Sequence, residues 1–63
     1  MEIGKKVRKE RLKSNLKQYQ LAKKANISNT YLSDIETGRT IPSLKTLKKL
    51  AEVLAVDCSI FLE

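Results

Sequence analysis

The segment QYQLAKKANISNTYLSDIET, residues 18–37, decides the fold because it holds two short helical patterns on either side of a tight turn. The first pattern covers about residues 18–25 and the second about residues 28–37, with Asn26 and Ile27 between them. The apolar side chains that recur at helical spacing are Leu21, Ala22, Ala25, Leu32 and Ile35. Two helices joined by so short a turn form a helix-turn-helix unit, a geometry that by itself occurs in many proteins.

Helical patterns also flank this unit on both sides. Apolar residues near helical spacing predict a first helix over about residues 2–14, which Asn15 ends in the left-handed conformation. Gly38 is the expected stop of the helix over 28–37, and residues 39–42 are predicted to form a loop.

A fourth helix is expected after Ser43, a good N-cap residue. Its apolar positions recur at i, i+3, i+7 and i+10 and are expected in the core: Leu44, Leu47, Ala51 and Leu54. Asp57 can cap a last short helix. Strict alternation of apolar and polar residues, typical of a half-buried strand, is absent from the sequence. The sequence therefore predicts an all-α fold of five short helices.

Length and composition limit what this chain can be. Its 63 residues, 41% hydrophobic and 32% charged, suffice for one thin core, so we expect residues 1–63 to form a single domain. The chain has no histidine and one cysteine, Cys58, which excludes a thiolate–imidazole zinc site and a disulfide framework within one chain. Without histidine no nucleophile–base pair can be assembled, so we expect no catalytic residue, no metal and no cofactor.

Positive charge is concentrated in the first part of the chain. Residues 1–26 carry nine basic and two acidic side chains, a net +7, whereas residues 27–63 carry four basic and five acidic ones, a net −1. The total of +6 favours an anionic partner, nucleic acid first and an anionic membrane surface second. A solvated lysine face is the alternative interpretation. Because no apolar run approaches ~20 residues and the N-terminus lacks a signal-peptide stretch, we expect a cytoplasmic protein.

The second helix of the 18–37 segment has one face free for recognition. Leu32 and Ile35 would hold it against the domain, Ile27 would fill the turn, and Ala22 is small where the two helices approach. The opposite face carries short or polar hydrogen-bonding side chains, namely Asn29, Thr30, Ser33, Asp34 and Thr37. Side chains of this kind can read base edges in the major groove of DNA.

With these positions in place, the sequence resembles a known family. The matching residues run along most of the chain and include Ile3-Gly4, Val7-Arg8, Arg11, Leu16-Lys17-Gln18, Leu21-Ala22, Ile27-Ser28, Tyr31-Leu32-Ser33, Ile35-Glu36, Gly38, Pro42-Ser43-Leu44, Leu47, Ala51, Leu54 and Val56. This order is similar to the Cro and phage-repressor family, the XRE-type helix-turn-helix proteins. The resemblance implies a compact five-helix lambda-repressor-like DNA-binding domain. It further implies a sequence-specific transcriptional regulator, a repressor that acts by occupying its operator.

The resemblance also implies roles for individual residues. The base-contacting residues would be Asn29, Thr30, Ser33 and Asp34. The phosphate-contacting residues would be Lys17, Gln18, Ser28, Thr37, Arg39 and Thr40. Arg11 and Glu36 match the family's internal ion pair, which ties the first helix to the recognition helix, and two unlinked surface charges are the alternative interpretation.

Three positions depart from the family's pattern. Lys17 stands where many relatives have Ser or Thr as the N-cap, and a cation there opposes the helix dipole. Asn26 stands where glycine is common, and asparagine tolerates that backbone. Asp34 can accept a hydrogen bond from cytosine N4, but it would repel a phosphate.

The C-terminal residues are rich in apolar side chains. We expect a homodimer interface on DNA built from Val56, Ile60, Phe61 and Leu62. A twofold dimer would bind a palindromic double-stranded operator, with its two recognition helices about 34 Å apart. The alternative function is a protein-interaction module, such as an antitoxin-like subunit that binds both a protein partner and DNA.

Overall fold

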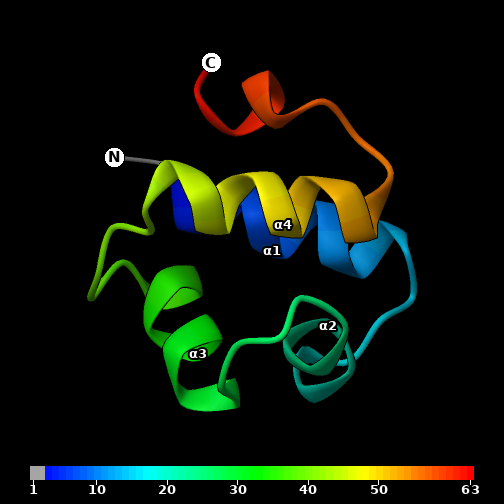
Figure 1. The fold of residues 1–63 in the computed structure, drawn as a ribbon, viewed down its shortest axis with the longest axis vertical. Helices are drawn as coiled ribbons and strands as arrows, with labels where there is room; N and C mark the ends of the chain where they lie inside the picture. Colours follow the sequence, from blue (N-terminus) through cyan, green and yellow to red (C-terminus); the bar gives the residue numbers. More distant parts are fainter. Residues whose placement is uncertain (1–2) are drawn as a thin grey trace.

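The computed structural model describes residues 3–63, and within them the chain forms four α-helices, one 3-10 helix and no strand (Figure 1). The elements in chain order are α1 (Ile3–Lys13), α2 (Gln18–Lys24), α3 (Asn29–Thr37), α4 (Leu44–Leu54) and η1 (Cys58–Phe61). The all-helical prediction is confirmed. No helix in this part of the chain has the length and apolar character needed to cross a membrane.

The predicted fifth α-helix is wrong, because η1 is a single 3-10 helix. The N–H of Ile60 donates to the Asp57 carbonyl and that of Leu62 to the Ser59 carbonyl, each at 3.0 Å, so these bonds span three residues. The Asp57 carboxylate accepts from the Ser59 N–H at 2.9 Å, only two residues on. Such a local side-chain bond competes with the wider α-helical turn.

The other helix boundaries differ from the predictions by one or two residues. The first helix ends at Lys13, and its predicted start at residue 2 lies outside the described residues. Ala25 is the C-cap of α2, and Ser28 is the N-cap of α3, so each stands just outside its helix.

Helices α1 and α4 form a layer that carries the other elements. Figure 1 shows α4 in front of α1, with α2 and α3 on one side of them and η1 on the opposite side. α3 packs against α1, and α2 packs against both α3 and α4. η1 contacts both α1 and α4. The helix-turn-helix unit and the C-terminal end of the chain therefore lie on different sides of this layer.

The buried apolar side chains of residues 3–63 form one cluster between these elements. Its largest fully buried members are Phe61, Leu21, Leu32, Ile35, Leu50 and Val7. Leu47, Ala51 and Leu54 are buried as predicted, but Leu44 is 54% exposed, so its assignment to the core is wrong. At 3.6 residues per turn, Leu44 falls at the edge of the stripe that the other three positions define.

All four α-helices within residues 3–63 end in the same backbone motif. The residue that ends each one has a positive φ, and these residues are Asn15, Asn26, Gly38 and Ala55. The following N–H then donates to a carbonyl five residues earlier, as from Arg39 to Asp34 at 2.9 Å and from Val56 to Ala51 at 3.0 Å. This is the Schellman motif. The predicted helix stops at Asn15 and Gly38 are confirmed.

Candidate nucleic-acid interface

The turn between α2 and α3 is closed by two hydrogen bonds. The Ile27 N–H donates to the Ala22 carbonyl at 2.9 Å, which ends α2. The Oγ of Ser28 accepts from the Tyr31 N–H at 3.0 Å and so caps α3. Ala22 is only 2% exposed, in line with a close approach of the two helices. Together these contacts fix the direction in which α3 leaves α2.

The predicted base-contacting residues lie on the outer side of α3. Asn29 and Thr30 are exposed in its first turn, and Ser33 and Asp34 are half-buried. The inner side of the helix is held by Leu32, which is completely buried, and by Ile35. The outer side therefore offers amide, hydroxyl and carboxylate groups to a ligand, the groups that pair with donors and acceptors on base edges.

The predicted phosphate-contacting residues lie at the start of α2 and at the two ends of α3. They are Lys17, Gln18, Ser28, Thr37, Arg39 and Thr40. The start of α2 and the end of α3 are close together, because the Gln18 Nε2 lies 3.3 Å from an oxygen of Glu36. The Thr37 hydroxyl donates to the Ser33 carbonyl at 2.9 Å, so its proton is already used within α3.

A buried bidentate ion pair joins α1 to α3. The Nε of Arg11 lies 2.8 Å from Oε2 of Glu36, and its Nη2 lies 3.0 Å from Oε1. The two side chains are 10% and 2% exposed. The remaining nitrogen, Nη1, donates to the Leu16 carbonyl at 2.9 Å. The Arg11 side chain therefore also contacts the segment that leads into α2.

Gly4 allows a second close contact between the same two helices. A Cβ added to Gly4 would overlap the carbonyl oxygen of Ile35 and would lie 3.1 Å from that of Glu36. The backbone of α1 therefore rests directly on the last turn of α3. The position of α3 relative to α1 is set by this backbone contact and by the ion pair together.

The start of α2 is capped by a residue that the sequence analysis missed. The Oε1 of Gln20 accepts from the Lys17 N–H at 2.8 Å, which is one half of a capping box. The Lys17 side chain itself does not cap α2, because an ammonium group cannot accept a hydrogen bond. A glutamine three residues after the N-cap position is the sequence signal that predicts such a bond.

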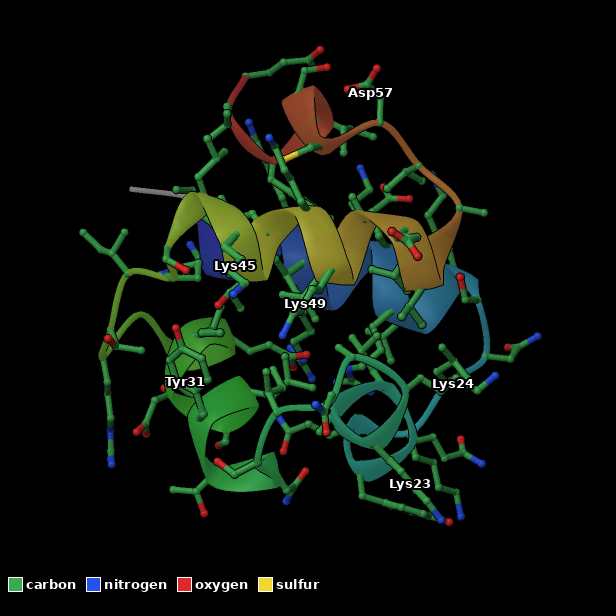
Figure 2. The ribbon with its side chains drawn as sticks, viewed as in Figure 1. Lys23, Lys24, Tyr31, Lys45, Lys49 and Asp57 are labelled. Atoms are coloured by element: carbon green, nitrogen blue, oxygen red, sulfur yellow. The ribbon has the colours of Figure 1, made fainter. Side chains whose placement is uncertain are left out.

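Further lysines lie outside the predicted contact set. Lys23 and Lys24 project from the end of α2, and Lys45 and Lys49 from α4 (Figure 2). A groove of about 220 Å³ between these helices is lined by Lys24, Ala25, Asn26, Lys49, Glu52 and Val53. The Glu52 carboxylate in its wall disfavours a phosphate there, so these lysines add positive potential rather than a defined phosphate site.

The C-terminal residues of the expected dimer interface differ in their exposure. Phe61 is 1% exposed and belongs to the core of the monomer. Val56 and Ile60 are partly buried and pack against the core, and Leu62 is 53% exposed. Burial therefore removes Phe61 from this surface, because the 3-10 turn directs it into the cluster.

The acidic residue Asp57 has a local role at the start of η1. Among residues 3–63, no three His, Cys, Asp or Glu side chains come together in a group that could hold a metal ion. Hydrogen bonds from the backbone N–H and then from the hydroxyl of Ser59 lower the pKa of the Asp57 carboxyl below its ordinary value. Asp57 thus stabilises the start of η1.

Known proteins resemble this chain along most of its length. A family model described as Helix-turn-helix matches residues 7–61. The chain is 41% identical over 58 residues to the ImmF control region 10 kDa protein of Bacillus phage phi105, which covers 92% of this chain and 64% of that protein. It is 44% identical over 59 residues to the immunity repressor protein of the same phage, which covers 94% of this chain and 41% of the repressor. The chain thus spans less than two thirds of each phage protein.

A solved structure has the same fold. SinR of Bacillus subtilis, crystallised in complex with DNA, matches with a TM-score of 0.93 and 32% identity, over 97% of this chain and 98% of that one. The family model covers well over half of the chain, and the matched residues include both helices of the α2–α3 unit. The resemblance inferred from the sequence is confirmed, and the chain belongs to the XRE-type helix-turn-helix family.

Proposed function

We propose that this protein is a sequence-specific DNA-binding regulator of transcription, which represses by occupying its operator and needs no catalytic step. The observation that carries the proposal is the exposed polar face of α3, held by the closed turn that follows α2. The net charge of +6 and the similarity to a phage immunity repressor and to DNA-bound SinR support it. Residues 1–63 would act as one DNA-binding domain in the cytoplasm.

Sequence would be read by the first turns of α3 in the major groove. Asn29 can pair with adenine through two hydrogen bonds, and Thr30 can contact a thymine methyl group. Ser33 can donate to or accept from either kind of base, and Asp34 can accept from the amino group of cytosine. Asn29 and Thr30 are the most exposed of the four, so they would reach furthest into the groove.

The backbone contacts would come from the two ends that Gln18 and Glu36 bring together. Phosphate oxygens only accept, so each contact needs a free donor. Gln18, Lys17, Arg39 and Thr40 can supply one, and Ser28 keeps its hydroxyl proton because its oxygen accepts the capping bond. Thr37 would have to release the Ser33 carbonyl first.

A homodimer would form on DNA through the C-terminal side chains that retain exposure. Leu62 is the most exposed of them, and Val56 and Ile60 are half-buried. Such a small apolar area fits a protein that is largely monomeric when free and pairs on a palindromic operator. The two recognition helices would then lie about one helical turn, roughly 34 Å, apart.

Selection of bound sequences from a random DNA pool at about 150 mM salt tests this function. We expect enrichment of one palindromic motif, and log K against log salt should fall with a slope of about −4 or steeper. A slope near zero, with no enriched motif, would contradict DNA binding and leave the partner-binding alternative. A single half-site bound with 1:1 stoichiometry would contradict the dimer.

Two substitutions separate base contacts from phosphate contacts on the selected motif. Asn29→Ala should cost about 1–3 kcal/mol on that motif and little on random DNA. Arg39→Ala should weaken both duplexes by similar factors, because phosphates carry no sequence information. Lys48→Ala, which removes an equal charge from the exposed side of α4, is the matched control. If Asn29→Ala leaves the ratio of affinities for the selected motif and random DNA unchanged while Arg39→Ala lowers it, the recognition face is misassigned.

A further inference from the structure

We propose that Glu36 is a positioning residue for DNA binding, which holds the Gln18 amide in the orientation that a phosphate requires. The inference rests on the proposed function, since it takes Gln18 as a phosphate ligand. It adds a second role to the buried ion pair: besides joining α1 to α3, the pair would set the affinity of the protein for DNA through the first residue of α2.

Two hydrogen bonds from the ion pair attach the start of α2 to the rest of the protein. The Arg11 Nη1 donates to the Leu16 carbonyl at 2.9 Å, and the Gln18 Nε2 donates to the Glu36 Oε1 at 3.3 Å. The capping bond from Lys17 to Gln20, by contrast, is local to α2. The bonds to Arg11 and Glu36 therefore tie residues 16–18 to α1 and α3.

The Glu36 carboxylate also fixes the orientation of the Gln18 amide. A carboxylate can only accept, so it selects the orientation in which the Gln18 nitrogen, not its oxygen, lies beside it. One N–H of the planar amide is then bound, and the second diverges from it in a fixed direction. A phosphate oxygen only accepts, so this second N–H, whose direction the bond to Glu36 fixes, is the group that a phosphate can contact.

Holding this orientation before DNA arrives lowers the cost of binding. A free glutamine side chain loses rotamer freedom when it is immobilised, and a side chain already held by the protein has lost it on folding. Gln18 is half-buried, and the Glu36 side chain that holds it is 2% exposed and itself fixed by Arg11. The ion pair thus supplies a rigid support for a side chain at the surface.

The test uses full-length protein with Glu36→Gln, Gln18→Ala and both changes together. Affinity is measured on the selected motif and on a random duplex, after far-UV circular dichroism shows that each variant is folded. Glu10→Gln is the matched control, because it also removes one negative charge from a side chain of low exposure: the Glu10 side chain is 12% exposed and lies 3.7 Å from the Lys13 ammonium group. Both changes raise the net charge by one, and charge alone would strengthen DNA binding.

We expect Glu36→Gln to weaken binding by about threefold to tenfold on both duplexes, the size of one hydrogen bond, although it makes the protein more positive. The ratio of the two affinities should stay the same, because a phosphate contact carries no sequence information. In the Gln18→Ala background, the same change should have no further effect. Glu10→Gln should bind as tightly as the unsubstituted protein or more tightly.

Three results would overturn the inference. The first is equal DNA affinity of the Glu36→Gln and Glu10→Gln proteins. The second is a loss of affinity from Glu36→Gln that persists in the Gln18→Ala background. The third is a loss of affinity confined to the selected motif, which would show that α3 has moved. If Glu36→Gln does not fold, Glu36→Asp takes its place, because it keeps the charge but retracts the carboxylate by one methylene. We then expect the same loss of DNA affinity, and no further loss when Glu36→Asp is combined with Gln18→Ala. Failure of the unsubstituted protein to bind DNA would instead contradict the proposed function.

Discussion

The junction between α1 and α3 and the junction between α4 and η1 are held by different forces. At the first, a bidentate ion pair is buried between the helices, and the backbone at Gly4 rests on the Ile35 carbonyl. At the second, Phe61 is inserted into the apolar cluster that also contains Leu50 and Leu54. The directional contacts thus lie beside the recognition helix, and the non-directional ones lie on the far side of the layer.

This difference indicates what each junction is for. An ion pair with two hydrogen bonds and a backbone contact accept little variation in angle, so they fix where α3 points. Apolar burial depends mainly on area and volume and tolerates small shifts. We therefore expect substitutions at the α1–α3 junction to change the affinity for DNA as well as stability, and substitutions at the α4–η1 junction to change stability alone.

The largest effect is expected from Glu36→Ala, which leaves the Arg11 charge buried and unpaired. The free energy of unfolding should fall by about 3–5 kcal/mol, measured by chemical denaturation. Replacing both partners, as Arg11→Met with Glu36→Leu, should recover much of this loss because no charge is then buried. Glu10→Ala should cost less than about 1 kcal/mol, because its partner Lys13 is 64% exposed and stays solvated when the pair is broken. Similar losses for Glu36→Ala and Glu10→Ala would mean that the junction is not held by its ion pair.

A second comparison sets Gly4→Ala against Phe61→Leu. Each should lower the free energy of unfolding by about 1–3 kcal/mol, the first by overpacking against the Ile35 carbonyl and the second by leaving a cavity. Only Gly4→Ala should also lower the ratio of affinities for the selected motif and random DNA, because it shifts α3. A fall in that ratio for Phe61→Leu would erase the distinction between the two junctions.

The sequence predicted the parts of this structure that depend on neighbouring residues. Ser28, Ser43 and Gly38 begin or end their helices as expected, because capping acts through side chains and backbone within one turn. The 3-10 form of η1 was not predicted, because Asp57 can cap either kind of helix.

The long-range contacts were predicted only where the family resemblance supplied them. The pairing of Arg11 with Glu36 came from the resemblance, whereas the bond from Gln18 to Glu36 joins residues 18 positions apart and has no local signal. The spacing of apolar residues also did not predict which C-terminal side chains are buried. Leu62 and Phe61 are both apolar, and only the three-dimensional path of η1 exposes the first and buries the second.

A smaller effect is expected where both junctions share one backbone motif. Gly38 ends α3 and Ala55 ends α4, each in the left-handed conformation. Alanine pays a steric cost there that glycine does not, so Ala55→Gly should raise the free energy of unfolding by about 0.5–1 kcal/mol. Gly38→Ala should lower it by about 1–2 kcal/mol through its φ of 83°, since no atom lies within 4 Å of the added Cβ. If both substitutions raised the free energy of unfolding, or both lowered it, this explanation would be contradicted.

The smallest effect concerns a polar bond within the apolar junction, at Asp57. The pKa of its carboxyl is lower in the folded protein than its ordinary value of 3.8, because it accepts hydrogen bonds from the backbone N–H and then from the hydroxyl of Ser59. Because this pKa is lower in the folded than in the unfolded state, the carboxylate stabilises the folded protein at pH values above its unfolded-state pKa. This contribution is lost as the pH falls through the folded-state pKa. Melting temperatures measured from pH 6 down to pH 2 should therefore fall less for Asp57→Asn than for the unsubstituted protein. Ser59→Ala, which keeps the backbone N–H, should lie between them, and an Asp57→Asn curve as steep as that of the unsubstituted protein would show that the bond to Ser59 does not stabilise η1.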